Sequence, residues 1–567
     1  MKIRSREDFC NVGRDYLLAR MARIVRRNGW ARILLLSGFL LFDAIFIHQH
    51  RYASATPVSR LDALHAVILE GSFAINEYET NTPDKAWKSV EAGWYSDKAP
   101  GAMVLALPAF AAAAGVVKLA GGDLDSRTGW LTTSWAACAF SQALPATLGA
   151  VALFIWLSRF VRPRAALVTV LALTLGSLPL PYSTLLFSHA QVIGLIGIAV
   201  WAGGMFEADA GCRIPDAGRQ KAENRSLKSE AGISTKRMAV AGFCLGLALA
   251  SEYTAGIVVV ALVAYVVVRE WRAGKGGGSG VWDFGARSLL GSTEAQEGEK
   301  LEARSWKPEE RQGSTVASPY RKRFRPLLWF LLAAVPPLLL IPAYSWATIG
   351  NPFQLPYSYQ ANFPAMKEGL YAIEWPDLDN LGRLLIGPTR GLVFWTSFLV
   401  MAGFGWWWMA KERPRWLWLT YAVPLLHALI ISGRTWDWQA GPTISARYLA
   451  PIIPLLALPC AIGTQRGPKL GGVLAIVSIA MMTLAPLTDA CPGYGVYNPL
   501  TQLNIPKFLK GEFSYTLGTE VFGLPPWLSV AVYYAILIGG IAWLWHLTGK
   551  ADKAVASQPL TNLDGRG

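Results

Sequence analysis

An acid and a base stand side by side in segment 95–101, Tyr-Ser-Asp-Lys-Ala-Pro-Gly, between a polar stretch and a strongly apolar one. The carboxylate of Asp97 could take a proton from an attacking hydroxyl, and the ammonium group of Lys98 could hold an anion. Charges beside a membrane are costly to desolvate, so they generally have a partner or a task. We therefore ask which other reactive side chains the fold must bring to this segment.

The composition is that of a membrane protein. The chain has 567 residues, of which 53% are hydrophobic, and it contains 24 tryptophans. The apolar residues come in blocks of about 18–25, the length that spans a bilayer as a helix. The net charge of +15 is explained by basic cytoplasmic loops, so no nucleic-acid partner is expected. The sequence predicts an all-α polytopic membrane protein.

About twelve crossing helices are predicted from the apolar blocks. Most of the 53 Lys and Arg residues then fall on one side, which predicts that both termini are cytoplasmic. The predicted spans are about 31–48, 133–158, 164–181, 188–206, 237–251, 254–269, 326–347, 391–410, 415–432, 447–464, 469–488 and 527–548.

The apolar block 101–118 is predicted not to cross fully. If 49–100 is external and the basic turn 159–164 is cytoplasmic, an odd number of crossings must separate them, yet two blocks lie between. The Pro100-Gly101 break favours a helix that re-enters or lies along the interface. Segment 95–101 would then lead into a helix that stays on the external side.

The chain divides into five regions on this topology. The C-terminal membrane region carries two external loops, 348–390 and 489–526, and the N-terminal region carries the first external loop, 49–100. The regions are a basic cytoplasmic leader 1–30, an N-terminal membrane core 31–269, a Gly/Ser-rich flexible cytoplasmic insert 270–325, a C-terminal membrane region 326–548, and a cytoplasmic tail 549–567.

Four more reactive side chains fall on the external side. Arg390 and Arg447 each precede or begin an apolar span, where an arginine can snorkel to lipid headgroups or clamp a phosphate. Glu252 lies between two apolar runs and could form a structural ion pair or line a polar pocket. His189 begins a helix, where it could act as a cap or belong to a site. Together with the acidic first loop, they suit transfer from a phosphate-linked donor.

Several motifs carry a resemblance to a known superfamily over about residues 59–450. They are Ser59-Arg60-Leu61, Glu70-Gly71-Ser72-Phe73-Ala74-Ile75, Asp84-Lys85-Ala86, Tyr95-Ser96-Asp97-Lys98-Ala99-Pro100-Gly101, Pro181-Tyr182-Ser183-Thr184 with Phe187-Ser188-His189, Glu252-Tyr253, Gly350-Asn351-Pro352-Phe353, Gly387-Pro388-Thr389-Arg390-Gly391 and Ala446-Arg447-Tyr448. In this order they resemble the multi-spanning GT-C type glycosyltransferases that use lipid-phosphosugar donors. That superfamily contains the protein O-mannosyltransferases and the bacterial lipid A aminoarabinose transferase, and the closest similarity is to an uncharacterised bacterial branch.

The resemblance implies an activity and its partners. It implies a bacterial inner-membrane enzyme with a periplasmic active site, a polyprenyl-phosphate-linked sugar donor, and a glycan, lipid or protein of the cell envelope as acceptor. It also implies inversion at the anomeric carbon, and an essential acid in the first external loop. A divalent metal ion assists some members, and no other cofactor is expected.

Site residues follow from the matching motifs. Asp97 and Asp84 are the candidate catalytic acids. Relatives often have Asp where this chain has Asn76, so Glu77 is a third candidate, and Asp62 is a weaker one. Lys98, Arg390 and Arg447 are expected to hold the lipid phosphate, and Tyr95, His189 and Glu252 to line the pocket.

Other functions remain open at this point. A flippase or transporter of lipid-linked sugars would have internal pseudo-symmetry and charged residues midway along several helices, and neither is clear in this sequence. A glycan ligase would carry its reactive residues in a late external loop. A non-enzymatic scaffold would not need the clustered external charges.

Overall fold

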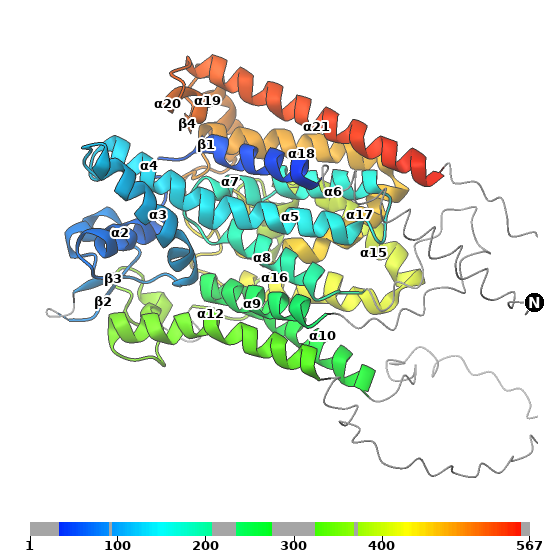
Figure 1. The fold of residues 1–567 in the computed structure, drawn as a ribbon, viewed down its shortest axis with the longest axis horizontal. Coiled ribbons are helices and arrows are strands. Elements are labelled where there is room, and N and C mark those ends of the chain that lie inside the picture. The colour runs from blue at the N-terminus through cyan, green and yellow to red at the C-terminus, as the bar shows by residue number, and fades with distance from the viewer. Residues whose placement is uncertain are drawn as a thin grey trace, which may run out of the picture.

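The computed structural model describes residues 33–50, 52–89, 93–206, 234–274, 324–367 and 372–556. Most of the long helices run side by side along the long axis of the molecule (Figure 1). Two short antiparallel ribbons accompany the helices, one pairing β1 (Ile47–His48) with β4 (Tyr515–Thr516) and one pairing β2 (Lys85–Trp87) with β3 (Trp94–Ser96). The fold is thus that of a helical membrane protein with two small strand pairs in its loops.

Eight helical stretches in the described residues are long and apolar enough to cross a membrane. Three shorter apolar helices, Ile33–Phe46, α6 (Pro163–Leu175) and α8 (His189–Ala202), lie among them. The eight stretches are Gly101–Leu119, Arg127–Leu157, Tyr253–Trp271, Arg325–Ile349, Pro414–Ser432, Arg447–Arg466, Pro468–Thr488 and Pro526–Gly549. A helix occupies every predicted span, while the count of about twelve crossings stays a prediction.

The stretch Arg127–Leu157 is one continuous helix of 31 residues, about 46 Å long at 1.5 Å per residue. Its parts are α4 (Arg127–Cys138), a π-helical turn (Ala139–Ala143) and α5 (Leu144–Leu157). The helix is longer than the hydrocarbon core, which is about 30 Å thick. The helix is therefore more than long enough to cross the hydrocarbon core.

The block predicted to re-enter forms α3 (Gly101–Leu119). It packs against α4 and the π-helical turn, and it also contacts α2 (Ala55–Leu69) and α9 (Thr235–Ser251). Its exposed face is apolar, with Val104, Val116 and Leu119 open. This helix therefore lies beside one half of the long helix, and its re-entrant or interfacial placement stays a prediction.

Two predicted spans are broken into shorter helices. The block 164–181 forms α6, which ends at Leu175, followed by the short α7 (Pro179–Ser183). The block 391–410 forms α14 (Leu392–Trp395), a 3-10 turn and α15 (Val400–Glu412). Proline explains the first break, because Pro179 and Pro181 lack the N–H that would continue the helix.

The remaining membrane-region helices have simple bounds. They are α9 (Thr235–Ser251), a 3-10 turn (Tyr253–Ala255), α10 (Gly256–Gly274), α12 (Arg325–Ile349), a 3-10 turn (Pro414–Trp416), a π-helical turn (Trp418–Ala422), α16 (Val423–Ser432), a 3-10 turn (Arg447–Ile452), α17 (Ile453–Arg466), α18 (Pro468–Thr488) and α21 (Pro526–Ala556).

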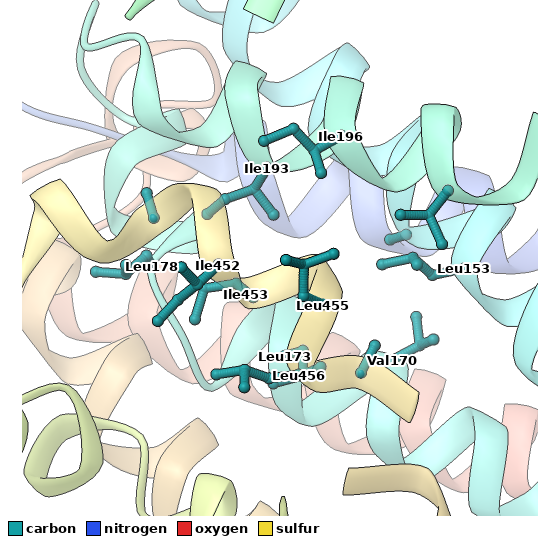
Figure 2. Close-up of a cluster of buried hydrophobic side chains, with 14 of the residues drawn as sticks. Leu153, Val170, Leu173, Leu178, Ile193, Ile196, Ile452, Ile453, Leu455 and Leu456 are labelled. Carbon is teal, nitrogen blue, oxygen red and sulfur yellow. The ribbon is translucent and has the colours of Figure 1, made fainter. Parts of the chain in front are cut away.

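The apolar core lies between α5, α6, α8 and α17. Figure 2 shows aliphatic side chains from these helices interleaved, among them Leu153, Val170 and Ile196. The helices α5 and α8 approach closely at Gly149 and Gly194, where an added β-carbon would meet backbone atoms of the other helix. This packed centre fixes where the ends of the helices lie.

At one end of the bundle, basic residues outnumber acidic ones in the described turns and helix ends. Hydrogen bonds join neighbouring helix ends there. The main-chain N–H of Arg162 donates to Gln465, and the guanidinium of Arg269 donates to the carbonyl of Gly203. The residues are Arg159, Arg162, Arg164, Lys236, Arg237, Arg269, Arg325, Lys411, Arg413, Arg415, Arg466 and Lys469. The α2 helix, the β2–β3 ribbon and the outer end of α4 lie at the opposite end (Figure 1).

The predicted external loops contain ordered elements. The first loop folds into α2 (Ala55–Leu69), a 3-10 helix (Asn76–Asn81) and the β2–β3 ribbon. Loop 348–390 holds 3-10 turns at Pro356–Tyr359 and Pro364–Lys367 and helix α13 (Leu378–Ile386). Loop 489–526 holds a π-helical turn (Leu500–Asn504), α19 (Ile505–Lys510), β4 and α20 (Leu517–Glu520). The leader, most of the insert and most of the tail lie outside the described residues.

Candidate active site

The acid–base pair of the first loop is part of a buried triad. The Nζ of Lys98 lies 3.0 Å from Oδ2 of Asp84 and 3.2 Å from Oδ1 of Asp97. All three side chains are buried. The sequence predicted Asp84, Asp97 and Lys98 as site residues, and the structure brings them together.

The two carboxyls of the triad have different proton affinities. Burial raises the pKa of Asp97, and the nearby charge of Asp84 raises it further, although Lys98 opposes both. Burial would also raise the pKa of Asp84, but Lys98 and the hydroxyl of Thr56 outweigh burial and hold it below the usual value. Two acids with opposed shifts suit two different roles in one site.

The β2–β3 ribbon positions the triad. Lys85 pairs with Ser96 across the ribbon, so Asp84 and Asp97, one residue beyond each, come to the same end. The hydroxyl of Ser59 on α2 lies 2.7 Å from Oγ of Ser96 and donates to the carbonyl of Asp84 at 2.6 Å. The ribbon is thereby fastened to α2.

A segment from the loop before α13 covers the triad. Gln360 donates from Nε2 to Oδ2 of Asp97 at 3.3 Å and to the carbonyl of Pro83 at 3.2 Å. The Nζ of Lys98 lies 5.5 Å from the ring centroid of Tyr357, a cation–π distance. Burial raises the pKa of the Tyr357 hydroxyl, so Tyr357 stays neutral at physiological pH.

A second polar group lies where α8 begins and α9 ends. Ser188 donates from Oγ to Oε2 of Glu252 at 2.7 Å, and Nδ1 of His189 lies 3.8 Å from the same oxygen. Burial would raise the pKa of Glu252, but His189, Ser188 and two arginines lower it overall. The predicted pocket residues His189 and Glu252 are therefore neighbours.

Arg60 connects the two groups. Its side chain is fully buried, and it donates to the carbonyl of Leu186 at 3.3 Å and to Oγ of Ser188 at 3.4 Å. Burial lowers its pKa, while Glu252 and Asp97 both raise it, so this guanidinium interacts with the acids of both groups. Sequence reasoning used Arg60 only as part of a matching motif, and did not single it out as a site residue.

Arg447 is buried without an acceptor of its own. Its side chain is 7% exposed, and in the described part of the chain it makes no hydrogen bond or ion pair. Its guanidinium carbon lies 4.7 Å from the ring centroid of Phe187 and 5.1 Å from that of Tyr448. A buried guanidinium without a hydrogen-bonding partner is costly, so an anionic ligand would be bound favourably there.

Two residues beside Arg447 were not predicted as site residues. Arg434 lies 3.7 Å from Asp437, and its guanidinium lies 4.9 Å from the ring of Tyr448. Tyr448 donates from its hydroxyl to Asp437 at 3.3 Å. These contacts place a second cation near Arg447, and a carboxylate that orients both Arg434 and Tyr448.

Arg390 differs from Arg447 in its hydrogen bonds. It is fully buried and donates to three main-chain carbonyls, those of Thr389 at 3.0 Å, Pro492 at 3.2 Å and Gly441 at 3.4 Å. Burial lowers its pKa to about 10, so it remains charged at neutral pH. The donor capacity of Arg390 is thus directed at the protein.

Three predicted site residues have fewer contacts with these groups. Glu77 lies on an exposed 3-10 helix, and its charge acts on Glu70 and Tyr78, raising the pKa of each. Tyr95 is half-buried on β3, where it pairs with Ala86 of β2. Asp62, the weaker candidate, is buried and accepts a 3.2 Å hydrogen bond from Asn81. Their predicted roles stay predictions.

The site combines acids, cations and aromatic rings at one end of the apolar helices. The described residues contain no group of three or more His, Cys, Asp or Glu side chains that could hold a metal ion. The cation between Asp84 and Asp97 is the ammonium group of Lys98. The site can therefore bind an anion at Arg447 and offer a carboxylate as base.

Comparison with known proteins gave a limited result. No protein-family model and no curated protein matches the chain. The crystal structure of ArnT from Cupriavidus metallidurans bound to undecaprenyl phosphate is similar, with a TM-score of 0.38 and 14% identity over 92% of this chain and 77% of that one. Its apo structure gives a TM-score of 0.36 and 16% identity over 94% and 78% of the two chains. Because both TM-scores are below 0.5, these two structures carry no argument about function, which must be inferred from the residues of this chain.

Proposed function

We propose that the chain is an inner-membrane glycosyltransferase that moves a sugar from a polyprenyl-phosphate carrier to an acceptor of the cell envelope. The observation that carries the proposal is the buried guanidinium of Arg447, which lacks a hydrogen-bond acceptor in the described chain. This guanidinium and the carboxyl of Asp97 belong to one cluster of interacting charges. Arg60 interacts with both of them. A phosphate at Arg447 would supply the missing acceptor.

The reaction is a displacement at the anomeric carbon. The acceptor hydroxyl forms a new bond from its oxygen to that carbon, and the bond between the carbon and the phosphate oxygen breaks. The pair of electrons leaves with the polyprenyl phosphate, and a carboxylate takes the hydroxyl proton. A single displacement of this kind inverts the anomeric configuration.

Each residue of the triad has a distinct role in this reaction. Asp97 is the base, because its raised pKa makes it the stronger proton acceptor of the two acids. Asp84, whose pKa is lowered, stays ionised and holds Lys98. Lys98 and Arg447 stabilise the charge that develops on the leaving phosphate.

The orientation of the bundle supports an external reaction. At the end opposite to the β2–β3 ribbon, basic residues outnumber acidic ones in the described turns and helix ends, and basic loops face the cytoplasm. The acids and Arg447 would then face the periplasm, and the apolar helices would accommodate the lipid chain of the donor.

The experiment that tests the proposal compares Asp97→Asn with Asp379→Asn in cells lacking the native gene. The polyprenyl-linked sugar that accumulates in those cells serves as donor for membranes containing each variant. We expect Asp97→Asn to lose about 100-fold or more of the transfer rate, as is typical for removing a general base. Asp379→Asn removes an exposed carboxylate of α13, which pairs only with the exposed Arg383 among the described ion pairs, and should retain most activity.

Both variants are checked for membrane insertion and amount. Full transfer by Asp97→Asn would overturn the assignment of the base. Equal accumulation of lipid-linked sugar with and without the protein would overturn the proposed reaction. Movement of the sugar lipid across the membrane without transfer would indicate a flippase.

A further inference from the structure

Arg390 joins three segments that are far apart in the sequence. Its Nη1 donates to the carbonyl of Thr389, and its Nη2 donates to the carbonyls of Gly441 and Pro492. The hydroxyl of Thr389 donates in turn to the carbonyl of Tyr497 at 2.7 Å. The turn before α14 is thus tied both to the 437–445 turn and to the loop after α18.

Gly441 is the point where this junction reaches Arg447. Its φ of +72° is left-handed, a conformation that favours glycine. A β-carbon placed on Gly441 would lie 3.9 Å from Nη2 of Arg447 and 3.6 Å from the hydroxyl of Tyr494. The N–H of Gly441 donates to Oδ1 of Asp437 at 3.0 Å, so this turn is held on both its sides.

We infer that Arg390 is a positioning residue, which holds the Gly441 turn against the guanidinium of Arg447 and does not itself contact the donor phosphate. The inference rests on the proposed function, because it takes Arg447 as the phosphate-binding residue. Arg390 and Arg447 each have a buried Nε without a partner among the described residues. They differ in the respect that decides the roles, because the Nη atoms of Arg390 donate to carbonyls, whereas the side chain of Arg447 makes no hydrogen bond within those residues.

The shape of the guanidinium explains why arginine is needed at this position. The planar group presents donors in fixed directions, so it reaches the carbonyls of Gly441 and Pro492 with one nitrogen and that of Thr389 with another. A lysine would keep the charge without this fork. The residue preceding it, Thr389, contributes the second tie of the same turn.

A double-mutant cycle distinguishes positioning from direct binding. Farnesyl phosphate is titrated calorimetrically into the purified full-length protein and into the variants Arg390→Gln, Arg447→Gln and the double variant. We expect each single variant to bind about tenfold more weakly, the scale of a charged hydrogen bond. The double variant should bind no more weakly than Arg447→Gln alone, because Arg390 acts through Arg447.

Additive losses in the double variant would overturn the inference, since they would mean that Arg390 contacts the phosphate independently. An effect of Arg447→Gln without any effect of Arg390→Gln would also overturn it while leaving the proposed function in place. If Arg447→Gln binds farnesyl phosphate normally, the phosphate site of the proposed function is wrong.

Arg390→Lys keeps the experiment decisive if Arg390→Gln does not fold. Loss of affinity in this charge-retaining variant supports positioning, and full affinity overturns it. Tryptophan fluorescence and gel filtration report whether each variant is folded, so a change in affinity in the folded protein is separated from a loss of structure.

Discussion

Ser188 donates a 2.7 Å hydrogen bond from its hydroxyl to the carboxylate of Glu252, and thereby joins the start of α8 to the end of α9. The two residues are 64 positions apart in the chain. Both lie among apolar helices, where an ionised carboxylate without donors would be strongly destabilising. This bond therefore allows a charged Glu252 to remain beside His189 and Arg60.

Replacing Ser188 by Ala should destabilise the protein. Glu252 would lose its shortest donor, and a hydrogen bond to a charged group contributes about 1.5–3 kcal/mol. Thermal and denaturant unfolding of the purified protein would measure the difference. Ser158→Ala is the matched control, because Ser158 only donates to the carbonyl of Phe154 within its own helix end. Equal destabilisation by both substitutions would contradict this role of Ser188.

The rate of transfer should fall as the pH decreases. The fall should begin at a higher pH than it would if the base were an exposed aspartate. The base must be ionised, and the raised pKa of Asp97 moves its protonation above the ordinary value of about 3.9. Asp84→Asn removes a negative charge that raises this pKa, so it should move the acid limb of the pH–rate profile to lower pH. A limb that stays in place or moves upward would argue against Asp97 as the base.

Lys98→Met should be strongly destabilising. The substitution would leave Asp84 and Asp97 buried beside each other without their shared cation, and breaking a buried pair costs about 3–5 kcal/mol. The folded fraction after purification and the free energy of unfolding measure this effect. In the control Arg383→Met, the lost ion pair with Asp379 is exposed to solvent, so a loss of about 0–1 kcal/mol is expected. Similar values for the two variants would contradict the prediction.

Gly194→Ala should disturb the packing of α5 against α8. An added β-carbon at Gly194 would lie 2.1 Å from the carbonyl oxygen of Pro145, so the helices must separate, at a cost of about 1–3 kcal/mol. Gly472→Ala in α18 is the comparison, because nothing lies within 4 Å of its β-carbon position. That variant should be stabilised by about 0.5–1 kcal/mol. Unchanged stability of Gly194→Ala would show that the two helices do not pack as described.

Local features of the sequence predicted the helical elements. The length of each apolar block requires a helix in a membrane, because every backbone group must be satisfied within the segment. A helix accordingly occupies each predicted span. The break of 164–181 after Leu175 was missed, although Pro179 and Pro181 were visible signals for it.

The sequence by itself determined the membrane character of the chain and the acid–base pair Asp97–Lys98, since block length and adjacent residues are local properties. Tertiary structure alone decided which partners these residues have. Asp84 reaches Lys98 through the pairing of β2 with β3, and Arg390 reaches Pro492 across 102 positions. Arg60 could be recognised as the link between the two polar groups only once the fold had placed α2 beside the turn that precedes α8. Such contacts join residues that are far apart in the sequence, and they depend on how whole helices and loops pack, which a local sequence pattern does not specify.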